Sequence, residues 1–458
     1  MLRDSLPASR PQGAKKRRRS RRHINCLEES VAARLELLLG QKNRELDEKP
    51  SSKALHLAHP FPAPMSPLVA RTIVNRTTRP GQKVLDPMVG SGTVVVVASV
   101  LGRTAYGLDI DPLSRLMVRV TVRNYDADKI WAATARVLSD ALALTANSRQ
   151  LDVLFERIFD TETKDFIRYW FPLRSRRSLL ALWLGIQNIN SVTTRNALAL
   201  AFSRSIIAKT SGASLAIDLP HTRPHKRAYK KVVDPLQTFA RRVDELLRRL
   251  NESRKENFSA IPSIRAGDAR KLPYQSGSID LVITSSPYAN AIDYVRAHKF
   301  SLVWMGHSVT ELAGLRAKMI GAERGERNIR EDFKWLENWL PRPSPKVNRR
   351  RAILRHYFYD LDEVIQQIHR VLDDGGASVF IVGRSTIGRR AIDTPAILVR
   401  IAERRGFKHV GTKMRRINPM RRSLPFATSK RLASGLGKRM SEEAVIGFAK
   451  QEYSSKKR

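Results

Sequence analysis

Two aspartates and a glycine turn form the first pattern in this chain whose residue types could do chemistry. In "VLDPMVGSGT", Asp86 ends a short apolar run and is followed by Gly90, Ser91 and Gly92. Glycines let the backbone turn sharply and approach a ligand, and a helix that begins here presents free N–H groups. Asp109 ends the next apolar run. A carboxylate at that place can accept both hydroxyls of a ribose.

Each half of this pattern also has a purely structural explanation. A Gly-Ser-Gly turn occurs without any ligand, and Asp109 or Asp111 could simply cap the helix that follows. The two halves together are more specific and favour a nucleoside-containing cofactor. The turn lacks the third glycine of the dinucleotide pattern, and no lysine follows Gly92. The sequence therefore disfavours a dinucleotide site and excludes a Walker-type phosphate loop.

A second group of chemical residues lies near "GDARKLP" and "DLVITSSPY". Asp268 could hold an adenine amino group, or it could be a turn aspartate. The short polar loop after the apolar run ends in Tyr288. In a nucleobase, the lone pair of an exocyclic amine is delocalised into the ring. Oxygens of a short polar loop such as this one can accept the hydrogens of the amine and so direct its lone pair at an electrophile. A base inside a duplex must first be flipped out, and an aromatic ring offers it a replacement stack.

These segments carry a family resemblance. "HPFPAP", "VLDPMVGSGT", "YGLDIDP", "GDARKLP" and "DLVITSSPY" follow one another in this order. Over residues 55 to 415 the chain resembles bacterial S-adenosylmethionine-dependent DNA methyltransferases that modify exocyclic amines, cytosine N4 or adenine N6. The resemblance implies S-adenosylmethionine as cofactor, duplex DNA with a flipped base as substrate, and a link to restriction-modification. Neither the target base nor the recognition sequence can be read from the sequence, although the serine-led loop leans slightly towards cytosine N4.

The resemblance also implies a role for each residue of these motifs. Cofactor contacts are expected at Phe61, Pro62, Asp86, Pro87, Gly90, Ser91, Gly92, Thr93, Asp109 and Asp268. In the catalytic loop, Ser285 would contact the target amine, Pro287 would shape the loop and Tyr288 would stack on the base. Ser286 departs from the family pattern, which has a proline here. The useful group of that proline is its carbonyl, so we expect a working loop that has lost some stiffness.

The surrounding periodicity predicts an α/β protein, with a Rossmann-like methyltransferase sheet, helices on both faces and a helical insertion. Strands are expected at 84–85, 106–110, 279–284, 377–383 and 407–413. Helices are expected at 94–101, despite its valines, across most of 126–257, at 361–372 with a stop at Gly375-Gly376, and at 397–405. From about Ser441 we expect a surface helix and a frayed tail.

The same reading divides the chain into five parts. They are a basic, disordered arm (1–50), the cofactor-binding half of the methyltransferase domain (55–125), a helical insertion that could recognise the target (126–260), the catalytic half (261–415) and a basic C-terminal tail (416–458).

The net charge of the chain indicates what kind of partner it binds. The chain has 83 Lys and Arg against 43 Asp and Glu, a net charge of +40. Such a field attracts polyanions, of which nucleic acid is the commonest. Phosphate contacts are expected at Lys15, Lys16, Arg17, Arg18, Arg19, His221, Arg223, Lys226 and Arg227. The alternative for these residues is a solvated tail and an exposed loop.

Several chemistries are disfavoured. Cys26 is the sole cysteine, so disulfides within the chain, cysteine zinc sites and the cysteine-dependent carbon-5 route do not fit. Pro224 between His221 and His225 argues against a metal site. Without an apolar span or signal core, we expect a cytoplasmic protein, nucleoid-associated when bound to DNA, with no membrane contact. An RNA (tRNA) base-amine methyltransferase and a non-catalytic nucleic-acid-binding protein remain alternatives, and the oligomeric state is not readable.

Overall fold

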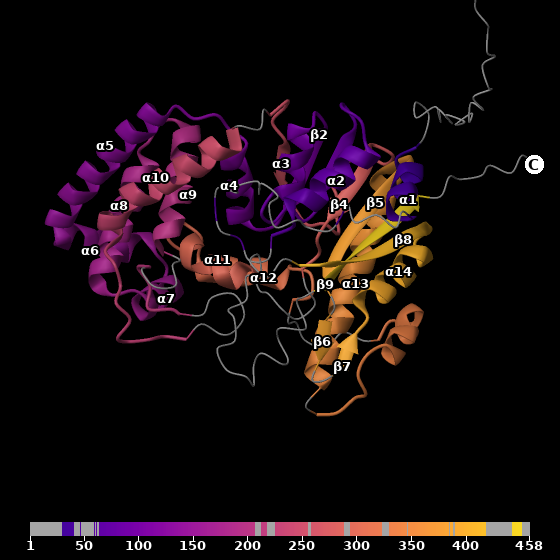
Figure 1. Cartoon of the computed structure of the whole chain (residues 1–458). Helices are drawn as coiled ribbons and strands as arrows, with labels where there is room; N and C mark the ends of the chain where they lie inside the picture. The colour runs from indigo at the N-terminus through magenta and orange to yellow at the C-terminus, as the bar shows by residue number, and fades with distance from the viewer. Residues whose placement is uncertain are drawn as a thin grey trace, which may run out of the picture.

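The computed structural model describes most of the chain. The described residues are 30–40, 46, 59, 61, 64–206, 212–217, 225–254, 258–287, 294–322, 329–345, 347–383, 385–387, 390–417 and 442–450. A layered α/β sheet stands beside a bundle of helices, with two further helices between them (Figure 1).

The main sheet has the strand order β3-β2-β1-β4-β5-β9-β8. Its strands are β1 (Lys83–Asp86), β2 (Thr104–Asp109), β3 (Ser263–Ala266), β4 (Ile279–Thr284), β5 (Leu372–Gly383), β8 (Phe407–Arg416) and β9 (Glu442–Lys450). The strands from β3 to β5 run parallel, whereas β9 is antiparallel to both of its neighbours. The chain winds outwards in both directions from β1, so the β1–β4 boundary is where a doubly wound sheet places its ligand crevice.

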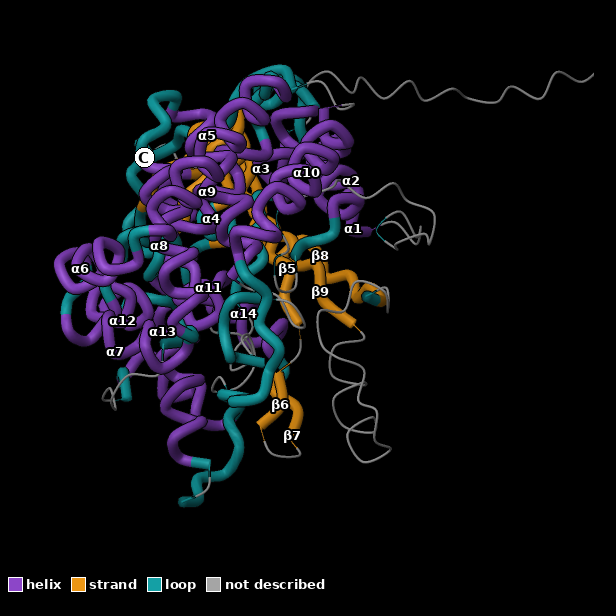
Figure 2. Tube along the Cα trace, turned by 90° about the vertical axis from the view of Figure 1, so that its left-hand side faces the viewer, coloured by secondary structure: helices purple, strands orange, loops and turns teal. Residues whose placement is uncertain are grey.

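Alternating side chains bury both faces of this sheet. Leu281 and Ile283 of β4 pack with α1 (Val31–Gly40), α2 (Pro67–Thr77) and α3 (Thr93–Val100). Val282, between them, packs on the other face with α13 (Asn348–Val371), α14 (Thr394–Arg404) and η1 (Glu331–Asn338). The predicted sheet with helices on both faces is confirmed. A small hairpin of β6 (Ser385–Ile387) and β7 (Arg390–Ile392) projects beyond it (Figure 2).

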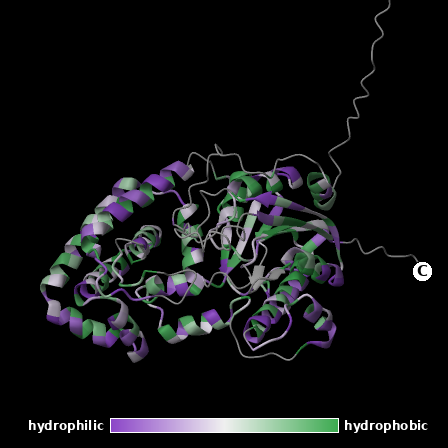
Figure 3. Cartoon of the chain, turned by 60° about the horizontal axis from the view of Figure 1, so that its bottom comes forward, coloured by the Kyte–Doolittle hydropathy of each residue, from purple (hydrophilic) through white to green (hydrophobic). Residues whose placement is uncertain are grey.

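The helical insertion has a core of its own. Its helices are α4 (Pro112–Thr121), α5 (Ala127–Ala146), α6 (Ser148–Ile158), α7 (Thr161–Trp170), α8 (Leu173–Gln187), α9 (Val192–Ile206) and α10 (Pro235–Arg254). Apolar residues of these helices pack against one another in one core, and hydrophilic and hydrophobic residues both occur along each helix (Figure 3). The helices α11 (Tyr294–Leu302) and α12 (Val309–Ala317) join this core and return the chain towards the sheet.

The valine-rich segment after the glycine turn is a helix, as predicted. The helix α3 begins after Gly92, and its residues from Thr93 to Ser99 are all buried. Valine is a weak helix former, but burial on every side of α3 outweighs that preference. The pairing of β1 with β2 in parallel also requires a crossover between them, which α3 provides.

Two expectations about where elements lie were wrong. Within the supposed arm 1–50, α1 is a packed helix, because its apolar stripe of Val31, Leu35 and Leu38 is buried against the sheet. The helix α13 ends at Val371, before the two glycines, and Gly375-Gly376 lie within β5.

The largest correction concerns the C-terminal segment. Residues 442–450 form β9, which fills the sheet between β5 and β8, rather than a surface helix or part of a basic tail. Seven consecutive residues of β9 are buried. A strand covered on both faces reads as a continuous apolar run without alternation, and such a run cannot be told from a buried helix by periodicity.

None of the helices in the described parts of the chain combines the length and the hydropathy needed to cross a membrane.

Candidate active site

A pocket lies at the carboxyl ends of β1, β2 and β4, where the topology predicts it. The cavity opens to solvent. The predicted residues that line it are Phe61, Asp86, Pro87, Gly90, Ser91, Thr93, Asp109, Asp268, Ser285 and Pro287. Gly92 and Ser286 lie just behind its wall, and Pro62 and Tyr288 fall outside the described residues.

The glycine turn is held to the second strand by Asp109. The Gly90 N–H donates to Asp109 Oδ2 at 2.7 Å, and the Asp111 N–H donates to Asp109 Oδ1 at 2.9 Å. Gly92 has a φ of 89°, and a Cβ there would lie 2.5 Å from Cγ2 of Val118. Both the backbone conformation and the close approach therefore require glycine at this position.

Two carboxyl groups in this pocket are costly to ionise. Burial raises the pKa of Asp86 to about 7 and that of Asp109 to about 6, and the charge of Asp111 adds to the second shift. Carboxylates destabilised in this way gain most from a cation or from hydrogen-bond donors. S-adenosylmethionine offers both, through its sulfonium, its ammonium and its ribose hydroxyls, so the donor and acceptor set of the pocket fits this cofactor.

Aromatic and buried polar side chains form the wall opposite the glycine turn. Phe61 stacks on Tyr294 of α11 with ring centroids 5.1 Å apart, and it also contacts His298, whose Nδ1 bonds to Asp111 Oδ2. Asp111 caps α4 as well, because its Oδ1 accepts from the Leu113 N–H at 2.8 Å. The capping role was anticipated. The contributions of Tyr294 and His298 were missed, because no local motif marks α11.

Asp111 and His298 form a buried pair behind this wall, with side chains 4% and 3% exposed. Burial alone would raise the pKa of Asp111. The adjacent His298 and two backbone N–H donors outweigh burial and hold that pKa below its ordinary value. The pair ties α4 of the insertion to α11, and thus fixes the wall against which Phe61 packs.

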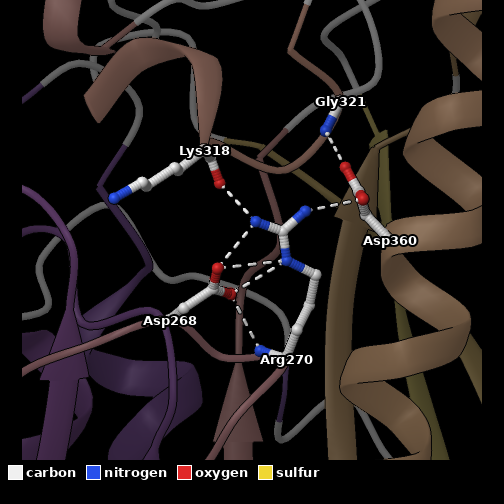
Figure 4. A network of polar contacts seen from close by, with 5 residues as sticks. All are labelled: Asp268, Arg270, Lys318, Gly321 and Asp360. Atoms are coloured by element: carbon white, nitrogen blue, oxygen red, sulfur yellow. Dashed lines mark hydrogen bonds and ion pairs between the residues drawn. The ribbon is translucent and has the colours of Figure 1, made fainter. Parts of the chain in front are cut away.

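Asp268 is in the pocket wall, but its carboxylate already has a partner. Arg270 Nη2 donates to Asp268 Oδ2 at 2.7 Å, and Arg270 Nε donates to Asp268 Oδ1 at 2.9 Å. Arg270 also reaches Asp360 of α13 and the carbonyl of Lys318 (Figure 4). Burial would raise the pKa of Asp268, yet Arg270 lowers it overall. Sequence reasoning missed Arg270, although it stands two positions after Asp268.

The two residues that flank Ser286 lie at the pocket. Ser285 and Pro287 are half-buried and line the cavity beside Asp86, whereas Ser286 is buried behind them. Ser286 is bonded elsewhere, to Tyr357, so its hydroxyl does not face the position where the target amine is expected.

Of the predicted phosphate contacts, two fall on described residues. Lys226 and Arg227 lie in an exposed loop that is pinned by Lys230, whose Nζ donates to the Ser214 and Ala216 carbonyls at 2.9 and 2.7 Å. The others, Lys15, Lys16, Arg17, Arg18, Arg19, His221 and Arg223, fall outside the described residues.

The sheet order, the glycine turn and the paired carboxyls define a class: an S-adenosylmethionine-dependent methyltransferase with a Rossmann-like fold. Comparison with known proteins agrees. Residues 11–114 match the family described as DNA methylase.

Curated relatives extend the match along the chain. The type II methyltransferase M.MvaI of Kocuria varians is 24% identical over 392 residues, which cover 79% of this chain and 84% of that protein. M.MjaII, a type II methyltransferase of Methanocaldococcus jannaschii, is 23% identical and covers 56% of this chain and 63% of the relative. The family match and these relatives confirm the resemblance to methyltransferases that modify exocyclic amines in DNA.

Solved structures give weaker likenesses. TrmN from Thermus thermophilus has a TM-score of 0.28 at 11% identity, covering 84% of this chain and 49% of that one. A TehB-like S-adenosylmethionine-dependent methyltransferase from Corynebacterium glutamicum has a TM-score of 0.27 at 11% identity, covering 83% and 87%.

Proposed function

We propose that this protein methylates the N4 amine of a cytosine flipped out of duplex DNA. The observation that carries the choice of base is Ser285, a short side chain with a neutral oxygen at the pocket wall, next to Pro287 and Asp86. Adenine N6 is the alternative outcome of the test below.

The residues of this chain supply position and electrostatics. The bound cofactor supplies a methyl carbon made electrophilic by the adjacent sulfonium. Asp86 and Asp109 hold the cofactor at the carboxyl ends of β1 and β2. Ser285 Oγ and the carbonyl of Ser286 accept the two hydrogens of the amine, so that its lone pair points at the methyl carbon. Tyr288 stacks on the flipped base. The nitrogen would take the methyl group as the carbon–sulfur bond breaks, the bonding pair would stay on the sulfur of the departing thioether, and one amine proton would leave to solvent.

The identity of the modified nucleoside tests this proposal. DNA is incubated with the protein and tritiated S-adenosylmethionine, then hydrolysed to nucleosides and separated. Label in N4-methylcytosine is the expected result, and Ser285→Ala should reduce it about a hundredfold. Label in N6-methyladenine would replace cytosine by adenine as the target. Label only in a parallel tRNA sample would contradict the choice of DNA.

The exposed loop 225–231 supports a DNA-binding surface on the helical insertion. Lys226 and Arg227 are accompanied by Tyr229, which is 99% exposed. A fully exposed aromatic ring among cations suits nucleic acid, because the cations meet phosphates and the ring stacks on a base. The Lys226 Nζ lies 4.2 Å from the ring centroid of Tyr169 on α7.

From this loop a series of contacts leads towards the active site. The Leu215 N–H donates to the Trp170 carbonyl at the end of α7. Trp170 in turn lines a cavity with Lys299 and Arg296 of α11. The first residue of α11, Tyr294, lines the cofactor pocket. One strand of DNA could therefore follow α7 and α11 from the loop to the flipped base.

Salt dependence distinguishes the two kinds of contact in this loop. Lys226→Ala should lower the slope of log K against log salt by about one, because one phosphate contact is lost. Tyr229→Ala should weaken binding about fivefold or more without changing the slope, since stacking releases no counterions. Lys129→Ala, on the exposed side of α5, serves as the control. An unchanged slope in Lys226→Ala would remove this loop from the DNA surface.

A further inference from the structure

Ser286, the residue that departs from the family pattern, is fastened to a helix on the far side of the loop. Its Oγ lies 3.0 Å from the hydroxyl of Tyr357 in α13. The two residues are 3% and 2% exposed, so water does not compete for this bond. Burial also raises the pKa of Tyr357 to about 12, and the hydroxyl therefore stays protonated at neutral pH.

The ring of Tyr357 supports a second segment of the pocket. A Cβ on Gly321 would lie 3.0 Å from Cδ2 of Tyr357, so the ring packs directly on the backbone there. Gly321 has a φ of 69°, which an L-residue with a side chain adopts with strain. The three residues before it, Lys318, Met319 and Ile320, line the cofactor pocket.

One turn further along α13, Asp360 holds the same segment from its other side. Asp360 Oδ2 accepts from the Gly321 N–H at 2.9 Å, and Oδ1 accepts from Arg270 Nη1 at 2.7 Å. Arg270 then binds the Asp268 carboxylate and the Lys318 carbonyl, as Figure 4 shows. Residues three apart lie on the same face of a helix, so one face of α13 carries both Tyr357 and Asp360.

We propose that this face of α13 is a brace that sets the target-base loop and the cofactor wall in one fixed relation. Tyr357 positions the loop through Ser286, and Asp360 positions the wall through Arg270 and Gly321. Neither residue lines the pocket, so both are positioning residues. The inference rests on the proposed function, because the loop is the part that holds the target amine.

The brace explains how the loop tolerates a serine. Proline would fix φ covalently and stiffen the loop through its ring. Serine leaves φ free, and the bond to Tyr357 restores a constraint from outside. A displacement of about 1 Å in a positioned group costs on the order of a hundredfold in rate, so the constraint bears on turnover more than on cofactor affinity.

A double-mutant cycle tests the link between Tyr357 and Ser286, which we call the loop arm of the brace. Tyr357→Phe removes the hydroxyl and keeps the ring over Gly321; it should lower kcat about tenfold and leave the Kd of S-adenosylmethionine unchanged. In a Ser286→Ala background, where the bond is already lost, Tyr357→Phe should have little further effect. Ser286→Pro should recover part of the lost turnover in the presence of Tyr357→Phe, because the ring of proline replaces the bond. Equal effects of Tyr357→Phe in both backgrounds would overturn the proposal.

A second tyrosine on the same helix supplies the matched control. The Tyr359 hydroxyl accepts from the Arg330 N–H at 3.2 Å, on the side of α13 that faces η1. Tyr359→Phe should lower the melting temperature about as much as Tyr357→Phe does, without changing kcat. If the two variants lose turnover alike, Tyr357 contributes only to stability.

The link from Asp360 through Arg270 and Gly321 to the cofactor wall, which we call the cofactor arm, can be tested by a binding measurement that needs no methyl acceptor. Asp360→Asn keeps an oxygen for the Gly321 N–H but removes the charge that holds Arg270. It should raise the Kd of S-adenosylmethionine about tenfold, measured by calorimetry on the full chain. This binding readout stands even if the wild-type protein transfers no methyl group to DNA, a result that would contradict the proposed function instead. An unchanged Kd in Asp360→Asn would overturn the cofactor arm.

Discussion

S-adenosylmethionine should bind more tightly as the pH rises from about 5.5 to 8, and Asp86 should cause most of the change. In the cofactor-free pocket, burial raises the pKa of Asp86 to about 7 and that of Asp109 to about 6. The ionised carboxylates are the forms that attract the positively charged cofactor, so binding releases protons below these values. For each proton released, affinity should rise up to about tenfold per pH unit and level off above pH 8.

The same raised pKa values make the stability of the cofactor-free fold depend on pH in the opposite direction to cofactor affinity. Since the folded state holds a proton on Asp86 that the unfolded state has lost, stability without cofactor should increase as the pH falls through about 7. Thermal unfolding without S-adenosylmethionine should therefore show stability that falls as the pH rises towards 7, whereas saturating S-adenosylmethionine should flatten this dependence, because Asp86 is then ionised in both the folded and the unfolded state.

Asp86→Asn isolates the residue responsible. Asparagine retains the oxygen that accepts from the Met88 N–H at 3.1 Å, so the glycine turn should keep its shape. The affinity for S-adenosylmethionine at pH 8 should fall about a hundredfold, and the step in affinity near pH 7 should disappear. Asp140→Asn, a half-buried position on α5 far from the pocket lining, should change neither. A step that persists in Asp86→Asn would assign the titration to another group.

What the sequence could reveal about the site depended on how local each contact is. Gly90, Gly92 and Asp109 were predictable because a tight turn and the end of a strand are each marked by a few neighbouring residues. The partners of the catalytic loop were not. Ser286 and Tyr357 are 71 positions apart, and Arg270 and Asp360 are 90 apart. No spacing rule connects them before the sheet has brought α13 against β4.

The same limit explains the errors in the fold. The helix α3 could be predicted against its valine content, because the order of parallel strands demands a crossover at that point. The strand β9 had no such constraint, since it returns from the end of the chain to a place between two strands already formed. Its buried run from Glu443 to Ala449 lacks the alternation that would have identified it.

Asp111→Ala should destabilise the fold by about 3 kcal/mol or more, the range for breaking a buried pair by removing one partner. The imidazole of His298 would remain buried at 3% exposure without the carboxylate that it contacts, and α4 would lose its cap. Asp393→Ala, which removes only the exposed cap residue of α14, should cost about 1 kcal/mol. Urea unfolding of the two variants measures the difference.

The pH dependence of the stability lost in Asp111→Ala shows whether the Asp111 carboxylate is its cause. Asp111 has a pKa below its ordinary value of 3.8, so its contribution should be complete above that pH and should disappear as the pH falls further. The gap between wild type and Asp111→Ala should therefore narrow in acid. Because His298 packs against Phe61, the variant should also bind S-adenosylmethionine more weakly at neutral pH. If Asp111→Ala costs no more than Asp393→Ala, the link between α4 and α11 contributes nothing, and the wall of the pocket is held by aromatic packing alone.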